Sequence, residues 1–163
     1  MKIFEEKQLF KRWWIIMFVL AIIVIVIGTA FYASEDSTEE TSVTISVISL
    51  VITIPIVFSV LLLRLDTRID DKGISTYFRP FGFTRKSFSW DEISECYIRS
   101  YSPLQEFGGW GLRILGMRSK AYNVAGNQGI QVVTNEGKKF LIGTQQPEDA
   151  QNTIDVYFKK NQP

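Results

Sequence analysis

The chain has 163 residues, enough for one domain of ordinary size and a further segment. Its net charge is +1, with 18 basic and 17 acidic residues, and this balance does not indicate nucleic acid as a partner. Histidine is absent and there is one cysteine, which excludes histidine-based triads, histidine-based metal sites, CxxC redox motifs and an internal disulfide.

Two uncharged runs dominate the first part of the chain and predict a transmembrane hairpin. The sequence predicts spanning helices over 13–33 and 43–63, because about 20 apolar residues in a helix match the thickness of a bilayer core. A cleaved signal peptide ending near Gly28-Thr29-Ala30 is the alternative for the first run. Basic residues flank both runs and the loop between them is acidic. The positive-inside rule then predicts a cytoplasmic segment over 1–12, an external loop over 34–42 and a cytoplasmic domain over 64–163.

These runs also predict how the two helices pack. Ser46, Ser49 and Thr53 share one helical face, and Ala21 and Gly28 lie two turns apart on the other helix. Small residues on facing helices let the backbones approach closely, so we expect these five to form the contact, although the serines and the threonine are also compatible with mere tolerance. Neither run contains an ionisable residue, which argues against an ion or proton pathway.

The second part of the chain changes to short strands. Strand-like segments at 74–79, 83–90, 94–101, 129–134 and 139–143 are separated by turn signals, and this spacing predicts a barrel or sandwich. From Pro147 the pattern becomes helical, with Ala150, Ile154, Tyr157 and Phe158 on one face. We expect this helix to bury its apolar face against the sheets.

The irregular middle of the chain is rich in glycine. Gly108, Gly109, Trp110, Gly111 and Arg113 form its centre. No GxGxxG or GxxxxGK[ST] pattern is present, so we interpret this segment as a structural or recognition loop that Trp110 holds against the strands.

The segments RIDDKGISTYFRPFGFTRKSFSWDEISECYI, GGWGLR, AYNVAGNQGI and LIGTQQPE resemble the membrane-tethered bacterial proteins with a pleckstrin-homology-like (PH-like) domain. The resemblance covers the chain from about Leu65 to its end. It implies two nearly orthogonal antiparallel sheets, a split barrel, closed by the C-terminal helix. It supplies no activity and no catalytic residue. The turn Asp70-Asp71-Lys72 departs from the basic hairpin by which eukaryotic relatives bind inositol phosphates.

A basic and aromatic hairpin tip is the candidate contact surface. It contains Arg79, Phe81, Phe83, Arg85 and Lys86. Such a tip fits either a protein partner or anionic lipid headgroups, and an ordinary solvated hairpin is the alternative.

The sequence therefore predicts a non-enzymatic binding or scaffold module in the inner (cytoplasmic) membrane, multi-pass, with both termini in the cytoplasm. Its expected partners are the lipid bilayer and a protein, with a homo-oligomer left open and no nucleic acid. No catalytic residue, metal or cofactor is expected. Two alternatives stay open: a small subunit of an oligomeric transporter or channel, and an enzyme that uses Asp91, Glu92, Glu95 or Cys96.

Overall fold

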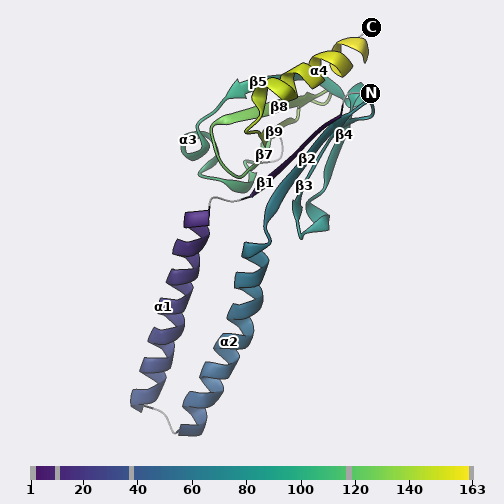
Figure 1. Ribbon diagram of the computed structural model, residues 1–163. Coiled ribbons are helices and arrows are strands. Elements are labelled where there is room, and N and C mark those ends of the chain that lie inside the picture. Colours follow the sequence, from purple (N-terminus) through teal and green to yellow (C-terminus); the bar gives the residue numbers. More distant parts are fainter. Residues whose placement is uncertain (1–2, 10–11, 37–38, 117–118, 162–163) are drawn as a thin grey trace. The chain divides into compact units, whose positions relative to one another are not determined.

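The computed structural model describes residues 3–9, 12–36, 39–116 and 119–161. It divides into two compact units, one formed by Met1–Phe10 with Arg64–Pro163 and the other by Lys11–Leu63 (Figure 1). In chain order the elements are β1 (Phe4–Leu9), α1 (Arg12–Asp36), α2 (Glu39–Leu61), β2 (Arg64–Asp70), β3 (Gly73–Arg79), the 3-10 turn η1 (Gly82–Thr84), β4 (Lys86–Ser89), the 3-10 turn η2 (Trp90–Glu92), β5 (Ile93–Ser100), α3 (Pro103–Phe107), β6 (Gly111–Ile114), β7 (Ser119–Asn123), β8 (Gln128–Thr134), β9 (Lys139–Gly143) and α4 (Pro147–Asn161).

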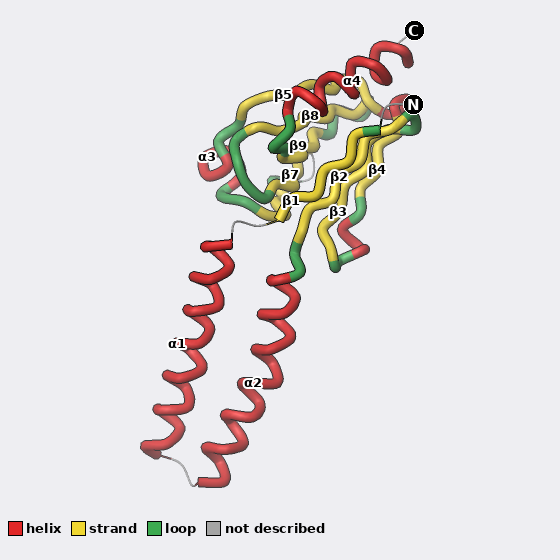
Figure 2. Tube along the Cα trace, in the orientation of Figure 1, coloured by secondary structure: helices red, strands yellow, loops and turns green. Residues whose placement is uncertain are grey.

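The first unit is a mainly-β domain with two sheets (Figure 2). One sheet has four antiparallel strands in the order β1-β2-β3-β4, and the other has five in the order β5-β8-β9-β7-β6. The pair β7–β9 is parallel, which departs from the purely antiparallel sheets that the resemblance implied. The predicted strands at 74–79, 94–101, 129–134 and 139–143 are present to within a residue at either end.

Alternation of side chains places the core between the sheets. On β2 and β3, the apolar residues Leu65, Ile69, Ile74 and Phe78 are buried and face the core. The exposed residues of the same two strands lie on the opposite side of the sheet. The helix expected from Pro147 is present as α4, with Ala150 and Ile154 fully buried.

The strand β1 was not anticipated from the sequence. Its buried positions are Phe4, Glu6 and Gln8, so two of three are polar and the alternation is not one of hydrophobicity. Both polar side chains have partners at the end of β9 or just beyond it. The Glu6 carboxylate accepts hydrogen bonds from the Thr144 hydroxyl at 2.6 Å and from the Gln145 backbone N–H at 2.8 Å. The Gln8 amide donates to the Gly143 carbonyl at 2.6 Å. The edge strand of one sheet is thus hydrogen-bonded to the last residue of β9 and to the segment that follows it.

The predicted transmembrane hairpin is contradicted. Helix α1 covers the first uncharged run and α2 covers most of the second. Over the residues that are described, however, none of the helices contains a stretch with the length and hydropathy needed to cross a membrane. The fold class of a transmembrane hairpin followed by the β domain is therefore wrong, and so is the inner-membrane location with both termini in the cytoplasm. The prediction rested on the length of two runs without charged residues, and that pattern alone does not establish that a helix crosses a bilayer.

In the second unit, α1 and α2 lie side by side (Figure 1). Ser49 and Thr53 are half-buried, and Thr53 lines the space between the helices with Val57. Among the described side chains of α1, Val19, Ile22 and Val26 are half-buried, whereas Ala21 and Gly28 are exposed. The side chain of Ser46 lies outside the described residues.

Candidate functional site

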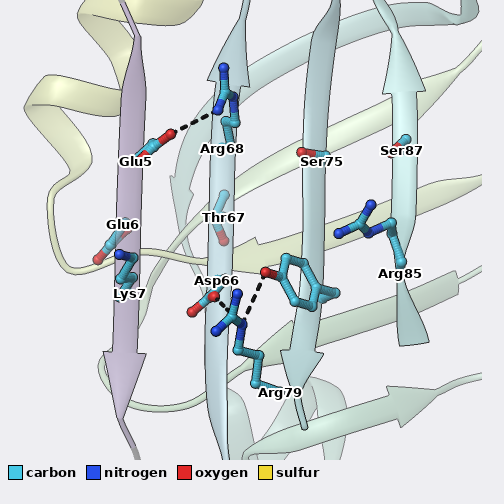
Figure 3. Close-up of a pocket in the computed structure, with 11 residues that line it drawn as sticks. Glu5, Glu6, Lys7, Asp66, Thr67, Arg68, Ser75, Arg79, Arg85 and Ser87 are labelled. Carbon is cyan, nitrogen blue, oxygen red and sulfur yellow. Dashed lines mark hydrogen bonds and ion pairs between the residues drawn. The ribbon is translucent and has the colours of Figure 1, made fainter. Parts of the chain in front are cut away.

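The outward side of the four-stranded sheet carries a recess of about 450 Å³ lined mainly by charged side chains (Figure 3). We call this surface the outer face and define it by Lys7, Arg68, Tyr77, Arg79 and Arg85, which come from β1, β2, β3 and the residue that precedes β4. The register places Lys7 opposite Asp66, and Asp66 opposite Tyr77. Residues far apart in the sequence are therefore neighbours on the same side of this sheet.

Tyr77 forms the centre of the outer face. The guanidinium of Arg85 lies 4.8 Å from the centroid of the Tyr77 ring, and that of Arg79 lies 5.7 Å from it. Both distances are within the range of cation–π attraction. Arg79 Nε also donates to the Tyr77 hydroxyl at 3.1 Å, and this hydrogen bond raises the pKa of Arg79. Two permanent positive charges are therefore held against one ring.

The acidic residues of the outer face neutralise only part of its positive charge. Asp66 is 3.1 Å from Arg79 Nε and 3.0 Å from Arg64 Nε, so one carboxylate serves two guanidiniums. Arg68 pairs with Glu5 and Asp70, each at 2.9 Å. Among the described residues, Arg85 and Lys7 have no carboxylate within ion-pair distance. Because Arg85 is exposed, its carboxylate-binding edge is open to a ligand.

An exposed aromatic pair continues the outer face at the β3–β4 connection. We call Phe81 and Phe83 the aromatic tip; their ring centroids are 5.6 Å apart, and Phe83 is 86% exposed. The tip is held from beneath by Thr84. The Thr84 hydroxyl donates to the Phe81 carbonyl at 2.7 Å and accepts from the Phe78 N–H at 2.8 Å. Of the five residues of the predicted tip, the structure places Arg79 and Arg85 on the outer face and Phe81 and Phe83 at the aromatic tip beside it.

Lys86, the fifth residue of the predicted tip, belongs elsewhere. It follows Arg85 directly, so the alternation of β4 turns it away from the outer face, and it lines a separate recess with Phe88. Sequence analysis missed Lys7, Arg68 and Tyr77, which come together only through the strand register. The alternation Ser75, Tyr77, Arg79 on β3 is the signal that relates Tyr77 to Arg79.

The glycine-rich segment is built around a short helix and a strand. Gly108 ends α3 with a left-handed conformation (φ 66°), which glycine adopts without steric cost. Trp110 is half-buried and donates through its indole nitrogen to the Gly126 carbonyl at 3.3 Å. The N–H of Gly111, the first residue of β6, donates to the Asn123 side chain at 2.8 Å. A Cβ on Gly109 would lie 3.0 Å from the Arg113 guanidinium, so Gly109 leaves space for that side chain.

The enzyme alternative rests on Cys96 and on carboxylates such as Asp91 and Glu92. These residues lie outside the outer face and outside the glycine-rich segment. Cys96 is 8% exposed, and its burial raises the pKa of the thiol to about 12, which keeps it protonated at neutral pH. Asp91 and Glu92 lie in η2, where Glu92 accepts from the Ser89 N–H at 3.3 Å as part of a capping box. Over the described residues, no group of three or more cysteine and carboxylate side chains is placed to hold a metal ion.

Comparison with known proteins adds no family to this description. No model of a known protein family matches the chain, and no curated protein matches it.

Proposed function

We propose that this protein is a non-enzymatic binding module whose outer face holds an acidic segment of a protein partner. We also propose that its mainly-β domain is PH-like, which the two sheets and the C-terminal helix α4 support. The observation that carries the function is the position of Arg85. Its guanidinium is stacked on Tyr77, has no carboxylate partner among the described residues, and stands two residues from the exposed Phe83.

The chemistry of the outer face favours carboxylates. A guanidinium presents a planar set of donors that matches a carboxylate, and stacking on an aromatic ring holds that plane in place before the ligand arrives. Arg85 therefore loses less side-chain freedom on binding than an unsupported arginine would. Arg79, bound to Tyr77 and Asp66, lies against the same ring and adds a second positive charge.

The aromatic tip supplies an apolar anchor beside these charges. Large aromatic side chains contribute strongly to binding when a partner buries them, and arginine is enriched at the same positions. Phe83 is almost fully exposed, so nearly all its apolar surface is available for burial in a complex. A partner segment with acidic residues next to an apolar residue would match both features.

The mixed charge of the outer face favours a protein over a lipid surface. Glu5 and Asp66 lie among the basic residues, and Glu5 is exposed. A uniformly anionic surface would be repelled by such carboxylates, whereas a protein segment can place a residue of either sign opposite each position. The arrangement thus supports a protein partner.

The test uses the full chain and a fluorescently labelled peptide in which glutamate pairs alternate with single tryptophans. We expect measurable binding by fluorescence anisotropy at low salt, weakening as salt is added because the contacts are charged. Arg85→Glu and Phe83→Ala should each weaken binding about tenfold, corresponding to about 1.4 kcal/mol. Lys72→Glu, which makes the same charge change in the exposed β2–β3 turn, is the matched control and should bind as the natural chain does.

Two outcomes would contradict the proposal. Equal binding by Arg85→Glu and Lys72→Glu would show that only the net charge matters. Binding to vesicles of anionic phospholipid, with no binding to the peptide, would assign the outer face to a lipid surface.

A further inference from the structure

A second recess, of about 270 Å³, has a basic rim and an aromatic floor. It lies between β4 of one sheet and the strands β7, β8 and β9 of the other. We call it the lysine recess; its lining residues are Lys86, Phe88, Lys120, Thr134, Lys138, Lys139 and Phe140. None of these residues belongs to the outer face.

The rim of the lysine recess concentrates positive charge. Four of its lining residues are lysines, and they come from β4, β7, β9 and the turn before β9. Lys138 pairs with Glu136 at 2.5 Å, although both side chains are largely exposed. In the part of the chain that is described, Lys86, Lys120 and Lys139 have no acidic partner within ion-pair distance. Since like charges repel, an anion shared among these ammonium groups would lower their mutual repulsion.

The floor of the lysine recess is aromatic and firmly packed. The rings of Phe88 and Phe140 have their centroids 5.2 Å apart, and Phe140 also packs against Tyr122 at 4.9 Å. Phe140 is 4% exposed, whereas Phe88 is half-buried and presents part of its ring to the recess. A hydrated inorganic ion would leave this apolar surface uncovered, while a planar organic group would cover it.

We propose that the lysine recess binds a small phosphate monoester that carries a planar ring. The phosphate lies among the lysine ammonium groups, which bind phosphate as mobile point charges, and the ring lies against the accessible part of Phe88, which packs on Phe140. The volume of about 270 Å³ is below the range of about 300–1,000 Å³ that is common for drug-sized ligands, which limits the ligand to about one ring system.

The experiment titrates the full chain with phenyl phosphate, inorganic phosphate and phenol, using isothermal calorimetry and saturation-transfer NMR. Phenyl phosphate should bind at least tenfold more tightly than either of the other two, because only it engages both rim and floor. The double variant Lys86→Gln with Lys139→Gln should weaken phenyl phosphate binding at least tenfold. Arg68→Gln with Arg85→Gln removes the same charge from the outer face and should leave the affinity unchanged.

Several results would overturn this assignment. Equal weakening by the two double variants would reduce the effect to net charge. Equal affinity for phenyl phosphate and inorganic phosphate would remove the role of the floor, and equal affinity for phenol would remove that of the rim. Lys86 and Lys139 are exposed, and a thermal melt of each variant checks that it is folded.

Phe88→Leu is a second test of the floor and should weaken the binding of phenyl phosphate without changing the affinity for inorganic phosphate. The acidic peptide should bind the lysine double variant as it binds the natural chain, so this inference and the proposed function fail separately.

Discussion

Replacing Glu6 by alanine should destabilise the β domain far more than the same change one residue earlier. Glu6 is 4% exposed and accepts two hydrogen bonds, from the Thr144 hydroxyl and the Gln145 N–H, at 2.6 and 2.8 Å. A hydrogen bond to a charged group contributes about 1.5–3 kcal/mol, and a buried donor left without a partner costs about 1–3 kcal/mol. Removing the carboxylate also relieves the cost of burying it, so we expect a net loss of about 2–4 kcal/mol in the free energy of unfolding.

The matched control is Glu5→Ala on the same strand. Glu5 faces solvent with 51% of its side chain exposed and makes one ion pair, with Arg68 at 2.9 Å. Exposed pairs contribute about 0–1 kcal/mol, so the two variants should differ by at least about 1 kcal/mol although both remove one negative charge from adjacent positions.

Urea unfolding of the full chain, followed by tryptophan fluorescence to which Trp90 and Trp110 of the β domain contribute, measures both free energies. The variant Glu6→Gln, which keeps an acceptor oxygen, should fall between the natural chain and Glu6→Ala. Equal midpoints and slopes for Glu5→Ala and Glu6→Ala would refute the reasoning, because they would mean that the buried carboxylate does not hold the two sheets together.

Three further changes test other parts of the domain by the same unfolding measurement. Gly73→Ala should destabilise the fold by more than about 3 kcal/mol, because an added Cβ would lie 2.0 Å from the Phe88 carbonyl oxygen. Its control is Gly137→Ala, which should cost only about 1 kcal/mol, because Gly137 has φ 74° and a Cβ there would have no atom within 4 Å. Equal losses in the two variants would contradict the steric argument. Thr84→Val should lower the free energy of unfolding by about 1–3 kcal/mol and Thr84→Ser by much less, since only valine removes both hydrogen bonds of the hydroxyl. Equal effects of the two variants would show that only the shape of the side chain matters. Burial raises the pKa of Cys96 from 9.0 to about 12. Because the thiol ionises first in the unfolded chain, its contribution to stability should be complete below pH 9 and fall progressively between pH 9 and about 12. A Cys96→Ala variant with the same alkaline loss of stability would exclude this origin.

The parts of the fold that depend on local patterns could be predicted from the sequence. β3 is a strand-like segment bounded by turn residues, β9 is a short apolar run that follows a turn, and α4 has an apolar face behind Pro147. β1 gave no such signal, because burial of Glu6 depends on Thr144, 138 residues away. The parallel pairing of β7 with β9 is likewise a contact between distant segments. The spanning helices were a wrong prediction from a local pattern, the length of two runs without charge.

The candidate site divides in the same way. Arg79, Phe81, Phe83 and Arg85 are close in sequence, and their composition alone marked the tip as a candidate contact surface. The role of Tyr77 depends on which face of β3 is solvated, and that of Lys7 on the pairing of β1 with β2. Lys86 was placed with its sequence neighbours, although alternation along β4 turns it to the lysine recess.

The pairing of Leu9 with Arg64 has a practical consequence for protein engineering. These residues face each other at the end of an antiparallel ladder, yet the whole helical unit separates them along the chain. Residues so placed are those that a tight two-residue reverse turn, such as Asn-Gly, joins in ordinary β-hairpins. A miniaturised version of the β domain should therefore splice 4–9 to 64–161 through such a turn, whereas a fragment cut at Arg64 would discard an edge strand and the buried carboxylate that it carries.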